Sequence, residues 1–259
     1  MTASPPDTPL DAIRRDIDTI DTEIVSLLAR RFAATERVKH TKAQDGSIAS
    51  SPFRPAREAA MMRRLVAGAP PGVHPDLLVR LWRVILSAST QSQAPITIHM
   101  DAIVGGELPT RILVSQHFCS MDVELHDSPA AALEALSGAR GDLAVIAPAS
   151  DWAAGFSARA GGAQVIGSLP VLAEGTAPHL LVFGHAEPQP SGEDETLFLL
   201  APESPAPASA LWSAGSGTTK IAGLPGFLAE GEPAFVAALV QSPGARVAGR
   251  YPRPIKVST

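Results

Sequence analysis

The chain has 259 residues and a formal net charge of −5, and hydrophobic residues make up 45% of it. This balance provides enough apolar material for a globular core, and the length predicts two or three domains. The negative charge argues against a nucleic-acid-binding protein, which would present a basic face. The single cysteine, Cys119, excludes an intramolecular disulfide framework and suits a reducing compartment.

The N-terminal residues lack the basic and apolar regions of a signal peptide. No run of the sequence approaches 18 apolar residues, the minimum for a membrane-spanning helix. We therefore expect a cytoplasmic protein that does not insert into a membrane.

The first predicted element is a long helix that ends before Asp45-Gly46. Asp7 or Thr8 provides the N-cap and Pro9 the first helical position. The helix would have about 36 residues and a length of roughly 54 Å. Its apolar residues alternate at spacings of three and four, which is typical of a helix seam that packs against a partner chain. These residues are Leu10, Ile13, Ile17, Ile20, Ile24 and Leu27.

Two shorter helices are predicted next, one from about residue 57 to Gly68 and one that begins near Pro75. In the second of them a core-facing stripe is predicted, which projects onward to Ser89 and Gln93. The stripe consists of Leu78, Leu81, Trp82, Ile85 and Leu86.

Polar side chains accompany these apolar stripes. Arg31 and Lys42 are eleven residues apart, which places them three turns apart on one helix face. A buried cation needs an anionic partner, and the seam offers few acids, so an anionic ligand would explain the pattern. Cations near helix ends also extend to solvent, and periodicity alone leaves both explanations open.

Together, residues 8–93 resemble the all-α class of chorismate mutases. The resemblance rests on an ordered set of short motifs at nearly the spacing of that family. The motifs are Leu10-x-x-Ile13-Arg14-x-x-Ile17-Asp18, Leu27-Leu28-Ala29-Arg30-Arg31, Val38-x-x-x-Lys42, Pro55-Ala56-Arg57-Glu58 and Ile85-Leu86-x-x-Ser89-x-x-x-Gln93.

The resemblance implies a three-helix module that forms an intertwined homodimer, with chorismate as substrate and with no cofactor or metal. Arg14 would enter the site of the other subunit, and Arg14 and Arg31 would hold the two carboxylates of chorismate. Lys42 and Gln93 would bind the ether oxygen. The remaining substrate-binding candidates are Glu58 at the ring hydroxyl, Ser89 at a carboxylate, and Arg57 along the pocket wall.

The expected reaction converts chorismate to prephenate by a unimolecular [3,3] rearrangement. The site must hold the reacting chair and stabilise negative charge on the ether oxygen, so fixed cations and one amide suffice. Arginine suits the carboxylates because its planar fork binds them through two hydrogen bonds. Arg54 is a departure from the family, which usually has an acid at this position. It would either weaken recognition of the hydroxyl or point to solvent.

The rest of the chain predicts an α/β region of strands and short helices. Residues 96–186 resemble a shortened, degenerate prephenate dehydratase domain, with a strand at residues 141–146. Pro178 and His179 stand where that family has a catalytic Thr-Arg pair. We therefore expect no dehydratase activity.

Residues 194–256 resemble an ACT domain, with strands expected at residues 195–200, 218–221 and 249–252 in a strand, helix, strand, closing-strand order. The effector-binding motifs of ACT domains are replaced here by residues 205–207 and 222–225. An amino-acid effector or another enzyme of the pathway remains a possible partner.

The histidines offer no obvious metal site, because no two of them stand at metal-ligand spacing with an acid. His99, His117, His179 and His185 are interpreted as ordinary surface or strand residues.

Chorismate mutase is therefore the leading hypothesis for function. An isochorismate–pyruvate lyase, which shares the helical fold, and a non-catalytic regulatory subunit of the aromatic pathway are the alternatives. A bifunctional mutase–dehydratase is disfavoured.

Overall fold

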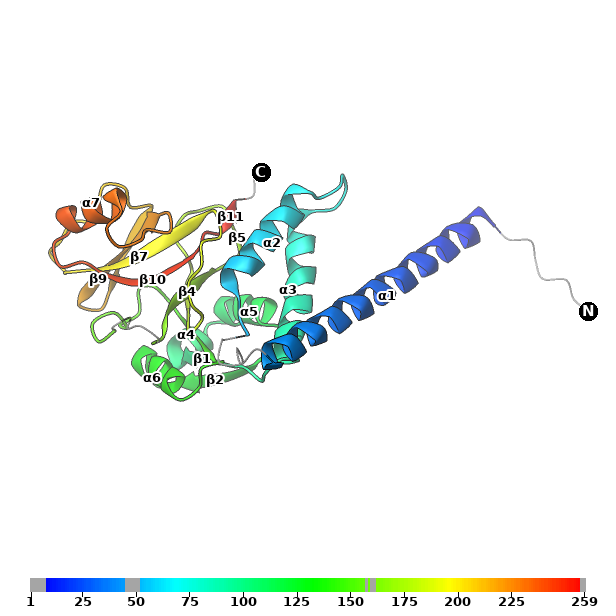
Figure 1. Ribbon diagram of the computed structural model, residues 1–259, viewed down its shortest axis with the longest axis horizontal. Coiled ribbons are helices and arrows are strands. Elements are labelled where there is room, and N and C mark those ends of the chain that lie inside the picture. Colours follow the sequence, from blue (N-terminus) through cyan, green and yellow to red (C-terminus); the bar gives the residue numbers. More distant parts are fainter. Residues whose placement is uncertain (1–7, 45–51, 157, 159–161, 257–259) are drawn as a thin grey trace, which may run out of the picture. The chain divides into compact units, whose positions relative to one another are not determined.

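A computed structural model describes residues 8–44, 52–156, 158 and 162–256 (Figure 1). The chain divides into two compact units, Met1–Ala49 and Ser50–Thr259. Each unit is described separately below. In both, none of the described helices is long and apolar enough to cross a membrane.

The described residues of the first unit form helix α1 (Pro9–Gln44), whose 36 residues confirm the predicted length. The backbone N–H of Asp11 donates to the hydroxyl of Thr8 over 3.3 Å, while the Thr8 hydroxyl donates to the Asp11 carboxylate over 2.5 Å. These two bonds satisfy polar groups that an uncapped helix would leave without partners. Pro9 occupies the first helical position, as predicted.

The apolar seam of α1 is open to solvent over most of its length. The six predicted seam residues, from Leu10 to Leu27, have exposed fractions of 49 to 57%. Each of these half-exposed apolar side chains contributes roughly 1 kcal/mol less hydrophobic stabilisation than it would if it were fully buried.

The second unit begins with α2 (Pro55–Ala67) and α3 (Pro75–Gln91), which pack against each other. Of the predicted core stripe of α3, Leu81 is 48% exposed and the other residues are partly buried in the single chain. The face that packs inward carries Val79, Arg83 and Ser87. Arg83 and Ser87 can be buried on this face because their polar groups form hydrogen bonds. The Ser87 hydroxyl, for example, donates to the carbonyl of His117 over 3.2 Å.

A nine-stranded sheet forms the centre of this unit, in the order β2-β1-β3-β6-β4-β10-β7-β9-β8. Strand β1 pairs in parallel with β2 and β3, β4 pairs in parallel with β10, and the remaining pairs of this sheet are antiparallel. The strands are β1 (Thr97–Asp101), β2 (Asp122–His126), β3 (Leu143–Ile146), β4 (Gln164–Leu169), β6 (Leu180–Gly184), β7 (Asp194–Leu200), β8 (Trp212–Ser216), β9 (Thr219–Pro225) and β10 (Arg246–Pro252), with β5 (Leu172–Ala173) and β11 (Ile255–Lys256) forming a separate pair.

Short helices cover the sheet and complete its cores. They are α4 (Ala102–Gly106), α5 (Leu108–His117), α6 (Pro129–Glu134), a 3₁₀ turn at Ala135–Ser137, and α7 (Pro233–Gln241). Phe53, just before α2, joins one core through its contact with Phe118, with the ring centroids 6.2 Å apart. On the other half of the sheet Phe235 of α7 packs against Phe198.

The compact units differ from the predicted division into residues 8–93, 96–186 and 194–256. Helices α2 and α3 belong to the same unit as the sheet, and the sheet continues through both predicted C-terminal domains. The two halves join where Gly249 of β10 faces Val165 of β4. A Cβ atom at residue 249 would lie 2.0 Å from the carbonyl oxygen of Val165, so only glycine permits this approach.

The strands expected at residues 141–146, 195–200, 218–221 and 249–252 correspond to β3, β7, β9 and β10. The element order of the last segment differs from the prediction. Strand β8 precedes β9, and the helix, α7, follows β9 rather than β7.

Candidate functional site

Three of the predicted site residues lie on α1. The helix is unbroken between Arg31 and Lys42, so the two positions share one side of it, as the sequence indicates. The side chain of Lys42 lies outside the described residues, and that of Arg31 is partly buried. Arg14 is exposed, and its Nη1 lies 3.5 Å from Oδ1 of Asp11.

Three more site candidates lie at the start of α2. Arg54 is the N-cap residue, and its carbonyl accepts the backbone N–H of Glu58 over 3.0 Å. Arg54 is partly buried. Arg57 is exposed. Glu58 is buried, and its Oε2 forms an ion pair with Nη2 of Arg83.

Arg83 on α3 is a residue that sequence reasoning missed. Its guanidinium is buried and also donates from Nη1 to Nε2 of His117, over 3.0 Å. Burial, followed by the nearby Arg83 cation, holds the pKa of His117 well below its usual value. His117 is therefore neutral and accepts the hydrogen bond. The sequence does contain a signal for this face: Arg83 lies four residues after Val79 and four before Ser87, so the three residues share one side of the helix.

Ser89 and Gln93 come together at the end of α3. The Ser89 hydroxyl donates to the carbonyl of Ile85 over 2.7 Å, and the Gln93 side-chain amide donates to the carbonyl of Ser89 over 3.1 Å. The helix ends at Gln91, so Gln93 lies in the following turn rather than on the projected helical stripe. Its backbone N–H donates to the carbonyl of Thr90 over 3.0 Å.

A cavity of about 60 Å³ borders Glu58, Arg83 and His117. Pockets that enclose drug-sized ligands have volumes of roughly 300–1,000 Å³. This cavity is therefore too small for a substrate such as chorismate.

The predicted site set is thus divided between the two units. Arg14, Arg31 and Lys42 belong to the first, and the second carries Arg54, Arg57, Glu58, Ser89 and Gln93. Within the second unit, the structure joins Ser89 with Gln93 and adds Arg83 as the partner of Glu58.

At the dehydratase-like position, Pro178 is buried and His179 is exposed. The backbone N–H of His179 donates to the carbonyl of Leu169 over 2.9 Å, which fixes the chain just before β6. Neither residue supplies the hydroxyl that the family's threonine would provide.

Spacing along the chain gives no histidine pair with an acid, but the fold brings one such pair together. The ring nitrogens of His99 and His126 lie 2.9 Å apart, and the carboxylate of Glu124 lies beside them. Spacing rules missed this group because the two histidines are 27 residues apart and meet only through the pairing of β1 with β2.

Comparison with known proteins gives limited similarity for the chain as a whole. No curated protein matches it. Among solved structures, the chain is similar to one described as GqqA, a novel type of quorum quenching acylases, with a TM-score of 0.36, 16% identity, and coverage of 60% of this chain and 94% of the other. It is also similar to prephenate dehydratase from Streptococcus mutans, with a TM-score of 0.37, 10% identity, and coverage of 63% and 100%. At these scores neither similarity supports a conclusion about this chain.

The helical part of the chain gives a more specific result. Its match begins within α1 and extends just past α3, so it includes every predicted site residue. The resemblance found in the sequence is confirmed for this segment: residues 13–94 match the family model of chorismate mutase type II.

Proposed function

We propose that this protein is a chorismate mutase, which converts chorismate to prephenate without a cofactor. The observation that carries the proposal is the match of residues 13–94 to the chorismate mutase type II family. The eight candidate site residues all lie inside the matched segment. Their types suit a reaction that requires a fixed substrate conformation and stabilised negative charge, with no nucleophile.

In this proposal the cations divide the work between binding and catalysis. Arg31 and the partner-derived Arg14 bind the two carboxylates through paired hydrogen bonds. Lys42 and Gln93 donate to the ether oxygen, where negative charge develops as the C–O bond breaks. Preorganised donors at such an atom lower the barrier because they need no reorientation during the reaction.

Glu58 would bind the ring hydroxyl through the carboxylate oxygen that Arg83 does not use. The ion pair with Arg83 fixes the orientation of this carboxylate and makes its burial tolerable. We therefore assign Arg83 a positioning role. Ser89, Arg57 and Arg54 complete the proposed substrate-binding set.

The proposed active form is a homodimer in which α1 crosses to the other subunit. The half-exposed seam from Leu10 to Leu27 supports this proposal, because pairing of two long helices would bury it. Arg14 lies 17 residues before Arg31, which turns it about 100° away from the Arg31 face. This direction is compatible with Arg14 serving a different site from Arg31.

The direct test is incubation of the purified full chain with chorismate, with product identification by chromatography. Prephenate formed in proportion to enzyme supports the proposal. Pyruvate released from isochorismate instead would support the lyase. A folded dimer that acts on neither substrate would support a regulatory subunit.

Prephenate offered as substrate should give no phenylpyruvate above the spontaneous background. Loss of the ring hydroxyl needs a positioned proton donor, and the Pro178–His179 position supplies no hydroxyl. Enzyme-dependent phenylpyruvate that disappears in His179→Ala would overturn this expectation.

The composite site is tested by mixing two inactive variants, Arg14→Ala and Lys42→Ala. After joint refolding, heterodimers contain one site with both defects and one with neither, so activity should return. Each variant refolded alone provides the control. If no activity returns although heterodimers form, Arg14 serves the site of its own chain.

A further inference from the structure

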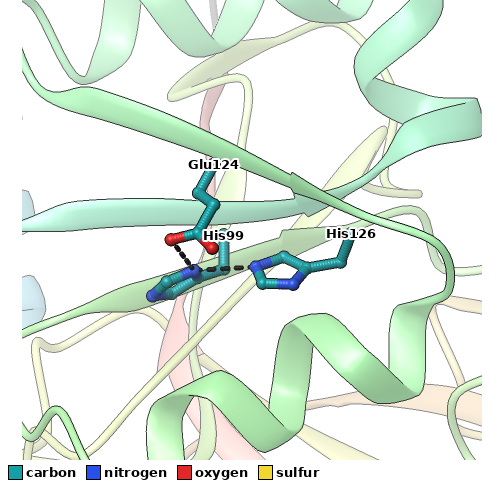
Figure 2. A group of neighbouring side chains, drawn as sticks. All are labelled: His99, Glu124 and His126. Atoms are coloured by element: carbon teal, nitrogen blue, oxygen red, sulfur yellow. Dashed lines mark hydrogen bonds and ion pairs between the residues drawn. The ribbon is translucent and has the colours of Figure 1, made fainter.

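Three potential metal ligands gather on one face of the sheet at its β1–β2 edge. His99 on β1 lies directly opposite Glu124 on β2 in the parallel register, and His126 follows Glu124 by two residues. Alternate residues of a strand share a face, so Glu124 and His126 point to the same side. Figure 2 shows both side chains directed at the same ring nitrogen of His99.

The distances between the ligand atoms are close to those in a tetrahedral site. Nδ1 of His99 lies 2.9 Å from Nε2 of His126 and 3.7 Å from Oε2 of Glu124. Two ligands at zinc distances of about 2.0–2.1 Å and a tetrahedral angle are separated by about 3.3 Å. The observed values bracket this separation, and all three ligand atoms lie within 4.8 Å of one another.

Asp142 supplies the outer partner that a metal-binding histidine usually has. Its Oδ2 lies 3.3 Å from Nε2 of His99, and its Oδ1 accepts the backbone N–H of Thr97 over 2.9 Å. A proton held on Nε2 by this carboxylate leaves the lone pair of Nδ1 directed at Glu124 and His126. The orientation of His99 and its tautomer are thus set for coordination.

One of the three ligand side chains is buried and another is open to solvent. The side chain of His99 is 6% exposed, whereas that of Glu124 is 61% exposed. Strand β2 is the last strand of the sheet, so an ion can approach from its free edge. Two imidazoles and one carboxylate form a ligand set that suits zinc and related transition metals, whereas Mg²⁺ and Ca²⁺ prefer oxygen ligands.

We propose that His99, Glu124 and His126 bind one divalent transition-metal ion of the zinc class, with a fourth position open to water or an exogenous ligand. Asp142 acts as the positioning residue that orients His99. The site lies entirely on the sheet and does not depend on the proposed mutase activity.

The test is calorimetric titration of the full chain with Zn²⁺, and with Mg²⁺ as the comparison ion. One Zn²⁺ should bind per chain with a rise in melting temperature, because an ion that binds only the folded state stabilises it. Co²⁺ should give the visible absorption of a four- or five-coordinate complex. Mg²⁺ should produce neither effect.

Variants separate this site from adventitious binding. His99→Gln and His126→Gln should abolish Zn²⁺ binding, and Asp142→Asn should weaken it by roughly 10- to 100-fold. The exposed Glu124→Gln tests the same ligand set with little risk to folding. His179→Gln, at an exposed histidine just before β6, should bind Zn²⁺ as the unmodified chain does.

Absence of Zn²⁺ binding in the unmodified chain would overturn the proposal and leave the group as a hydrogen-bonded network. Binding that survives in Glu124→Gln, His99→Gln and His126→Gln alike would also overturn it. Equal affinity for Mg²⁺ would contradict the assignment to the zinc class.

Discussion

The apolar residues of α1 and of strand β6 have similar chemistry but opposite environments. All five residues of β6 are buried between cores formed by the surrounding strands and helices, whereas the seam residues of α1 remain about half exposed. The sheet therefore satisfies its hydrophobic pattern within one chain. The long helix has a pattern that calls for a further surface, which we propose is the second subunit.

Helix α3 has both a buried face and an exposed apolar residue. Its inner face carries Arg83, buried and paired with Glu58, while Leu81 on another face is nearly half exposed. A charged residue is thus buried and a leucine is not. One side of α3 thus packs in the sheet unit, while another side leaves a leucine nearly half exposed in the single chain.

The largest expected effect on stability comes from removing the buried cation of α3. Arg83→Ala leaves the Glu58 carboxylate buried without its cation, which should lower the free energy of unfolding by about 3–5 kcal/mol. The matched control is Arg80→Ala on the same helix, whose ion pair with Asp76, at 2.8 Å, is exposed. Arg80→Ala should lower the free energy of unfolding, measured by denaturant titration, by less than about 1 kcal/mol. Equal costs for the two variants would contradict the role of burial.

A second prediction concerns the exposed helix α1, which we propose contributes Lys42 to catalysis. Lys42→Ala should lower kcat at least about 100-fold, the scale for loss of one preorganised donor to developing charge. Lys39→Ala, three residues earlier on α1, serves as the control and should retain most activity. Helix content measured by circular dichroism should be unchanged in both. Similar rates for the two variants would remove Lys42 from the catalytic set.

The smallest expected effect concerns a buried acid in the sheet. Burial raises the pKa of Glu195, although Tyr251 and Trp212 donate hydrogen bonds that favour the carboxylate. The folded state therefore keeps the proton to a higher pH than the unfolded state. The stability from Glu195 is fully present below about pH 4.5 and is lost as pH rises through the folded-state pKa.

Glu195→Gln should remove this loss, because the amide oxygen still accepts both bonds and carries no charge. Its unfolding free energy relative to the unmodified chain should rise above pH 4.5 by at most about 1.4 kcal/mol per pH unit. Glu187→Gln, at an exposed acid, provides the control for the loss of one carboxylate. Parallel stability curves for Glu195→Gln and the unmodified chain would refute the assigned pKa direction.

Local patterns predicted much of the fold. The three-and-four spacing from Leu10 to Leu27 defined α1, and short β-branched and leucine-rich runs located β3 and β7. The inner face of α3 could not be predicted in this way, because the partners of the buried Arg83 are distant in sequence: Glu58, 25 residues earlier, and His117, 34 residues later. The union of the two C-terminal segments in one sheet depends on the approach of Gly249 to Val165, which no local pattern records.

The candidate site was likewise predictable only in part from the sequence. Its residue types and order were visible in the sequence, and the match of residues 13–94 to chorismate mutase type II agrees with them. The roles of these residues remain predictions. The group of His99 and His126 escaped detection because strand pairing, rather than spacing along the chain, brings the rings together.

Arg63 joins α2, the helix of Glu58, to the far end of the chain. Its guanidinium donates to the carbonyls of Ser191, Glu193 and Arg253 over 3.1, 2.6 and 3.0 Å. A displacement of these C-terminal segments relative to α2 would have to break or stretch these three hydrogen bonds. One arginine thus ties the helix that carries Glu58 to three backbone carbonyls near the end of the chain.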